Sequence, residues 1–278
     1  MAVLLGVAAA VLSGAGDFYG GLASRLGRVT AVAIAAHGVG IITALVVSPF
    51  VSGSPAASDM LWGGLAGVSG GLAILALYRG FATGAIAVVS PIAAVGAGGW
   101  TVLFAFATGD RPAALQIVGL VVGLGAIWII SRSPDQGDGA GNRPAGVGYG
   151  LLAGAGFGGL LILLSAVGVG AGIWPLLPAR VAGGLTLLAV AAVSREVIVP
   201  HVRAVAPIAA SGALTVLGNG AFILAASRGS LAVVSTLTAM FPAATVVLAR
   251  IVLGEVLGPR RRMGLLLALI AVGLVASS

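Results

Sequence analysis

The segment GAIAVVS at residues 84–90 recurs as GSLAVVS at residues 229–235, 145 positions further along the chain. At the same offset, and without a gap, the dipeptide GD at residues 109–110 aligns with GE at residues 254–255. A gapless match that includes a shared acidic turn is unusual even in a sequence rich in glycine and alanine. It predicts that the chain contains an internal repeat.

The two copies are separated by a stretch rich in glycine, proline and aspartate, RSPDQGDGAGNRPA. Such a composition is typical of a flexible linker. We therefore predict a first domain over residues 1–131, a linker over 132–145 and a second domain over 146–278. Each domain contains five apolar runs, and because five is odd, the second domain must be inserted upside down relative to the first.

The apolar runs are long enough to cross a membrane. The chain is 59% hydrophobic and 8% charged, with a mean hydropathy of +1.18. A bilayer core of about 30 Å needs about 20 apolar residues per helix, and a backbone in lipid must satisfy its own hydrogen bonds. The sequence predicts an all-α integral membrane protein with ten transmembrane helices. The predicted spans are residues 2–22, 29–48, 60–80, 85–106, 113–131, 146–167, 174–194, 205–226, 231–252 and 262–277.

Several functional classes are disfavoured by composition. The net charge of +7 comes from arginines scattered over the loops, a distribution that membrane topology explains better than nucleic-acid binding. The chain has no cysteine. Its two histidines, His37 and His201, form no H-E-x-x-H motif, and no pair of intramembrane aspartates is present. We therefore predict no catalytic residues, no metal and no cofactor.

Two five-helix units, each with AVVSP or AVVST opening the fourth helix and a G-D/E turn before the fifth, resemble the EamA-type repeat of the drug/metabolite transporter superfamily. Within it the chain looks most like bacterial amino-acid exporters of the YddG type. This resemblance implies a monomer in the bacterial cytoplasmic membrane, with ten helices around a central cavity. It also implies export of amino acids, including aromatic and hydrophobic ones, by alternating access. The alternative is a multidrug exporter of lipophilic cations.

Asp17 is the one acidic residue that the predicted spans place away from a turn or a span end. A carboxylate at the centre of a transmembrane helix costs about 2.5–3.5 kcal/mol on insertion scales, so it is usually retained for a function. Asp17 could contact a substrate ammonium or carry a coupling proton. The other interpretation is that it lies near enough to the span end to pair with Arg25 or Arg28.

A polar stripe on the ninth span identifies further candidates. At 100° per residue, its members fall within an arc of about 80°; they are Ser235, Thr238, Pro242 and Thr245. Such a face should line a cavity or a helix interface. The repeat carries this stripe back to the fourth span, where it becomes Ser90, Ala93, Ala97 and Trp100. Trp100 would then be a cavity wall able to stack on a substrate, or else it packs against a neighbouring helix.

Each of four other residues has two possible roles. Asn219 lines the substrate site or joins helices by hydrogen bonding. Tyr78 gates the cavity or anchors at the membrane interface. Pro91 and Pro242 each free a backbone carbonyl and can act as hinges, although proline also occurs in static helices.

Arginine positions bear on topology. Eleven lie near the loops that follow odd-numbered spans, namely Arg25, Arg28, Arg79, Arg132, Arg143, Arg195, Arg203, Arg250, Arg260, Arg261 and Arg262. Three lie on the other side, namely Arg111, Arg180 and Arg228. The positive-inside rule therefore favours both termini outside the cytoplasm. The family resemblance implies both termini inside, although residues 48–59 lack the basic side chains usual in that loop.

Overall fold

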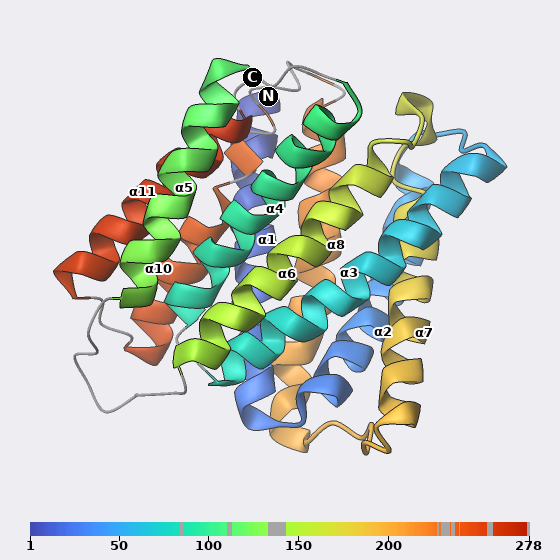
Figure 1. Cartoon of the computed structure of the whole chain (residues 1–278). Coiled ribbons are helices and arrows are strands. Elements are labelled where there is room, and N and C mark those ends of the chain that lie inside the picture. The colour runs from blue at the N-terminus through green and yellow to red at the C-terminus, as the bar shows by residue number, and fades with distance from the viewer. Residues whose placement is uncertain are drawn as a thin grey trace.

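Ten α-helices make up the part of the chain that this computed structural model describes, and that part contains no strand. The described residues are 1–83, 86–109, 113–132, 143–226, 228, 234, 237–238, 240–254 and 258–276. The helices are α1 (Ala2–Leu26), α2 (Val29–Val47), α3 (Ala57–Thr83), α4 (Ile86–Ala107), α5 (Ala114–Arg132), α6 (Arg143–Leu164), α7 (Leu176–Val193), α8 (Val205–Ala226), α10 (Phe241–Leu253) and α11 (Pro259–Ala276) (Figure 1). Six of them are long and apolar enough to span a membrane, and the other four carry shorter apolar stretches. The predicted all-α membrane fold is confirmed.

The ninth predicted span, residues 231–252, contains the helical residues Val234, Leu237 and Thr238 and then α10, which begins at Phe241. Met240, with a ψ of 5°, lies outside the helix, and α10 starts at Phe241. Pro242 therefore falls in the first helical turn, where its missing N–H breaks no helical hydrogen bond. Pro242 lies in the first turn of α10 and Pro91 lies inside α4, and their roles as hinges stay predictions. Ser235, part of the predicted stripe, lies outside the described residues.

Successive helices run in opposite directions, so their connections alternate between the two ends of the molecule (Figure 1). Both chain termini lie at one end, which we call the terminus end. The connections α1–α2, α3–α4, α7–α8 and α10–α11 lie at the opposite end. We call this the arginine end, because its described arginines are Arg25, Arg28, Arg79, Arg195, Arg203, Arg250, Arg260 and Arg262.

The helices of the two halves pack across one another in a matched pattern. Helix α1 packs on α8 and α10 of the second half, and α6 packs on α3 and α4 of the first. The pairs α2–α7 and α5–α11 also join the halves. Counting helices from the start of each half, the first helix of either half therefore packs on the third and fourth of the other.

Glycines allow α1 to approach three other helices closely. A methyl group added at Gly14 would collide with the Phe241 carbonyl oxygen of α10, and one at Gly16 would lie 2.5 Å from Thr215 Oγ1 of α8. At Gly20 the same change would meet the ring of Tyr78 on α3. Thr245 also donates a hydrogen bond of 3.0 Å to the Gly14 carbonyl. These glycines place α1 in the middle of the helix bundle.

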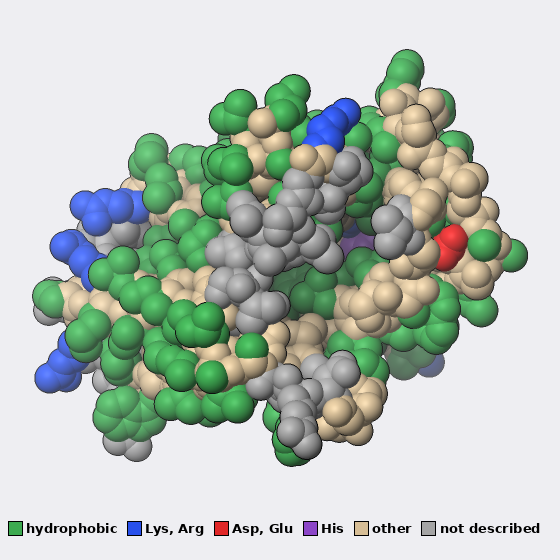
Figure 2. All heavy atoms as spheres, turned by 90° about the horizontal axis from the view of Figure 1, so that it is seen from above, with side chains coloured by type: hydrophobic (Ala, Val, Ile, Leu, Met, Phe, Trp, Pro, Cys, Tyr) green, Lys and Arg blue, Asp and Glu red, His purple; other side chains and the backbone are tan. Residues whose placement is uncertain are grey.

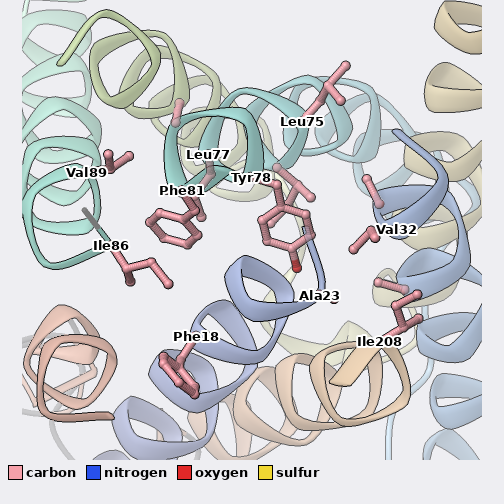
Figure 3. Close-up of a cluster of buried hydrophobic side chains, with 14 of the residues drawn as sticks. Phe18, Ala23, Val32, Leu75, Leu77, Tyr78, Phe81, Ile86, Val89 and Ile208 are labelled. Carbon is pink, nitrogen blue, oxygen red and sulfur yellow. The ribbon is translucent and has the colours of Figure 1, made fainter. Parts of the chain in front are cut away.

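The largest cluster of buried apolar side chains, part of which Figure 3 shows, takes its members from helix turns nearer the arginine end. Phe18 of α1 belongs to the same cluster as Tyr78 and Phe81 of α3, whose rings stack with centroids 6.4 Å apart. Ile86 and Val89 add the first turns of α4. Because α1 and α3 approach the arginine end with these residues, the apolar side chains fill the space between helices there.

Loops of the two halves also meet at the terminus end. The Asp59 carboxylate, in the first turn of α3, accepts hydrogen bonds of 2.8 Å from the Ala56 and Gly168 N–H groups. The Ser54 N–H donates to the Gly170 carbonyl at 3.0 Å. The loop between α2 and α3 is therefore attached to the loop between α6 and α7.

Gly14→Ala should destabilise the protein because the added methyl group has no room beside Phe241. Overpacking of this kind costs about 1–3 kcal/mol. Gly38→Ala is the matched control, since nothing lies within 4 Å of the position its methyl group would occupy. We expect the thermal unfolding midpoint in detergent to fall for Gly14→Ala and to stay the same or rise for Gly38→Ala. Equal midpoints would contradict the close packing of α1 on α10.

Alkaline phosphatase fused after α11 should be active, because the arginine end should face the cytoplasm and the fusion point lies at the opposite end. Each arginine near the cytoplasmic leaflet is worth about 1 kcal/mol of surface attraction. A green fluorescent protein fusion at the same place is the control and should be dark. A fluorescent fusion beside an inactive phosphatase fusion would reverse this topology.

Candidate functional site

Five polar side chains from five helices converge inside the bundle. Four of them are buried, and Arg180 is partly exposed. We call this set the polar cluster; it consists of Asp17 of α1, His37 of α2, Tyr78 of α3, Arg180 of α7 and Ser211 of α8. Polar and charged groups are expensive in a bilayer interior, so such a concentration is a candidate functional site.

Tyr78 and Ser211 form the neutral side of the cluster. Their hydroxyl groups share a hydrogen bond of 2.8 Å, and their residues are 2% and 1% exposed. Thr215, one turn further along α8, donates to the Ser211 carbonyl at 2.7 Å. Gly20 of α1 leaves the space that the Tyr78 hydroxyl occupies. The pair therefore joins α3 of the first half to α8 of the second. Because Gly20 has no side chain, α1 can pack closely against this pair.

Asp17 is 7% exposed, and the charged partner that acts on it is Arg180. Both charges also act electrostatically on the Tyr78 hydroxyl. Among the described residues, no protein group donates a hydrogen bond to the Asp17 carboxylate. Arg25, one of the partners suggested by the sequence, donates its Nε–H to the Phe81 carbonyl at 3.1 Å. Asp17 thus has an opposite charge nearby and unused acceptor capacity.

Arg180 and His37 occupy the crossing of α2 and α7. A methyl group added at Gly40 would lie 3.2 Å from Arg180 Cδ, and one at Gly183 would lie 2.7 Å from His37 Nε2. Each helix therefore places one long polar side chain against a glycine of the other. The His37 Nδ1–H donates to the Ala33 carbonyl at 2.9 Å, since a carbonyl can only accept. That bond fixes the ring on α2.

The polar cluster lies between a packed region and a hollow. Asp17 and Tyr78 adjoin the large apolar cluster towards the arginine end. From the terminus end, Figure 2 shows a hollow among hydrophobic side chains, with a histidine visible inside it. Arg180 stands in the first turns of α7, the helix half nearer the terminus end. The arrangement can receive a small polar molecule beneath an apolar entrance.

The other predicted site residues that the structure describes lie on α4, on α8 and in or just before α10. Ser90 is buried, and neither its hydroxyl nor that of Thr238 has a hydrogen-bond partner within the described part of the chain. Trp100 is 50% exposed, with its Cβ close to Gly158 of α6. Asn219 is partly buried on α8, and Pro242 is buried in α10. Their proposed roles in substrate binding stay predictions.

Arg180 is the site residue that sequence reasoning missed. It was counted with the loop arginines, whereas the structure places it inside α7. The available signal was its position several residues into the span predicted at 174–194. His37, which belongs to no metal-binding motif in the sequence, lies with Arg180 at the crossing of α2 and α7. Among the described residues, no group of three or more His, Cys, Asp or Glu side chains could hold a metal ion.

Comparison with known proteins finds a family match in the second half of the chain. Residues 145–277 match the EamA-like transporter family. A solved structure titled "Crystal structure of protein" shares 14% sequence identity over 99% of this chain and 97% of that chain, with a TM-score of 0.57, so the two chains are similar in fold over nearly their whole lengths. No curated protein matches the chain. The second half is therefore similar to a family of membrane transporters of small molecules.

Tyr78→Phe and Ser211→Ala should each destabilise the protein by about 1 kcal/mol. Each change removes one of the two hydroxyl groups and leaves the other buried without its hydrogen-bond partner. The double variant should lose less than the sum of the two, since both single changes remove the same bond. Free energies of unfolding in mixed detergent measure this coupling. Tyr19→Phe is the matched control and should change stability little. Strict additivity would show that the two hydroxyl groups are not coupled.

Proposed function

We propose that this protein is a secondary transporter that exports amino acids across the bacterial cytoplasmic membrane by alternating access. The observation that carries the proposal is the polar cluster, which combines one negative and one positive side chain inside an apolar bundle. A transporter needs such a site near the middle of the membrane, between two groups of helices that can move relative to each other.

The matched packing of the two halves supports an inverted repeat. Each half contributes five helices, and an exchange of the halves converts the α1 contacts with α8 and α10 into the α6 contacts with α3 and α4. In inverted-repeat transporters, one repeat rocks against the other around a fixed site. The cluster takes residues from both halves, so this motion would alternately expose it to the two sides.

The distribution of large side chains suggests which state the structure represents. The apolar cluster around Phe18, Tyr78 and Phe81 fills the arginine end. At that end an ion pair of 3.4 Å also joins Arg79 of α3 to Glu196 after α7. The hollow in Figure 2 faces the terminus end. We infer a state that is closed at the arginine end and accessible from the terminus end, beside the attached loops.

The charge balance of the cluster favours a zwitterion. A lone Asp17 would suit a lipophilic cation, but Arg180 places a compensating positive charge near it. The side chains around the hollow in Figure 2 are mostly hydrophobic, which suits neutral amino acids with hydrophobic or aromatic side chains. Under this proposal Ser90, Trp100, Asn219, Ser235 and Thr238 extend the substrate wall, Pro91 and Pro242 serve as hinges, and the protein acts as a monomer.

Vesicles containing the purified protein should catalyse saturable counterflow of radiolabelled phenylalanine, because a carrier that alternates between two states exchanges substrate across the bilayer. Empty vesicles are the control. In bacteria, expression should raise resistance to toxic amino-acid analogues relative to cells carrying the empty vector. Resistance to quaternary ammonium dyes alone, with no phenylalanine counterflow, would replace the amino-acid proposal by the lipophilic-cation alternative.

A further inference from the structure

Resting on the proposed function, the inference concerns how the substrate is oriented. We propose that Arg180 and Asp17 are the two poles of the substrate site, with the guanidinium binding the α-carboxylate of an amino acid and the Asp17 carboxylate binding its α-ammonium group. The proposal adds Arg180 as a specificity-determining residue.

The position of Arg180 is set by the crossing of α2 and α7. Its side chain passes Gly40, where an added methyl group would lie 3.2 Å from Cδ and 3.5 Å from Nε. The stem is therefore confined beside α2, while the residue as a whole stays partly exposed. Within the described part of the chain, the guanidinium donates no hydrogen bond to a protein group. A planar group with five N–H donors held in this way is suited to a carboxylate.

The equivalent place in the first half carries no permanent charge. His37 and Gly40 on α2 have the same spacing as Arg180 and Gly183 on α7, and each polar residue packs on the other helix's glycine. The His37 Nδ1–H is already used on the Ala33 carbonyl. The permanent positive charge at this crossing therefore comes from the second half alone. The two halves thus contribute differently to the site, so its two ends are not equivalent.

Asp17 provides the opposite pole. Only 7% of the residue is exposed, yet no described group donates a hydrogen bond to its carboxylate. An ammonium group brings three donors and could satisfy these oxygens. Both charges act electrostatically on the Tyr78 hydroxyl, which is itself hydrogen-bonded to Ser211. That hydroxyl already has a partner, so the unused hydrogen-bonding capacity of Asp17 and Arg180 remains for a ligand.

A site of this kind should reject ligands that carry only one of the two charges. A cationic amino-acid amide places its neutral end against Arg180 and adds a positive charge to the cluster. An N-acylated amino acid places its neutral end against Asp17 and adds a negative charge. Each leaves one charged side chain of the site without its partner, and specificity commonly arises from that penalty.

The test uses the full chain, purified in nanodiscs, and three probes: phenylalanine, phenylalaninamide and N-acetylphenylalanine. Titration calorimetry should show that the wild type binds phenylalanine about 10- to 100-fold more tightly than either of the others. In Arg180→Gln the preference over phenylalaninamide should disappear while the preference over N-acetylphenylalanine remains. In Asp17→Asn the reverse should hold. Arg228→Gln, which changes an exposed arginine after α8, should behave as the wild type.

A second measurement needs no variant and covers the case in which either substitution prevents folding. Phenylglyoxal modifies accessible arginines, and mass spectrometry reports the extent at each one. Phenylalanine should protect Arg180 in the wild type, whereas phenylalaninamide should not. Equal protection by both compounds, or unchanged probe preferences in both folded variants, would overturn the proposal and leave the transport function standing. Failure of the wild type to bind or exchange phenylalanine would overturn both.

Discussion

Close contact between glycine-bearing helices is the interaction on which the rest of the structure depends. In lipid there is no hydrophobic drive that brings one apolar helix to another, so packing and short-range hydrogen bonds must hold the bundle. Gly14, Gly16 and Gly20 bring α1 against α10, α8 and α3 in turn. This helix carries Asp17 between the second and third of these contacts. The same residues that assemble the bundle therefore set where the charge lies.

The cluster also shows why charged groups inside a membrane protein need company. A buried carboxylate or guanidinium is costly by itself, and a pair is costly unless its hydrogen bonds are completed. Asp17 and Arg180 compensate each other in charge, but described protein groups do not complete their hydrogen bonding. Tyr78 and Ser211, in contrast, complete each other. The neutral pair is a complete contact between the halves, whereas the charged pair keeps hydrogen-bonding capacity that the proposed ligand would use.

Much of the fold could be predicted because hydropathy and the repeat act over long stretches. Ten spans followed from the apolar runs, and Asp17 stood out because it interrupts one of them. The start of α10 at Phe241 could not be predicted from Pro242, because proline occurs both in the first turn of a helix and inside kinked helices. Arg180 was missed because counting arginines by loop assigns each one to a membrane surface. Its place depends on Gly40, which lies on a different helix in the other half of the chain.

The crossing of α2 and α7 has a consequence for how such a carrier could arise from a duplicated ancestor. Two identical halves would present a ligand with two equivalent poses, related by the axis that exchanges the halves. A molecule with distinct ends would then bind in either orientation, and neither could be selected. Two differences remove this degeneracy: histidine at position 37 against arginine at position 180, and Asp17 on α1 against no acidic residue on α6. Divergence at a few positions gives a symmetric scaffold a direction.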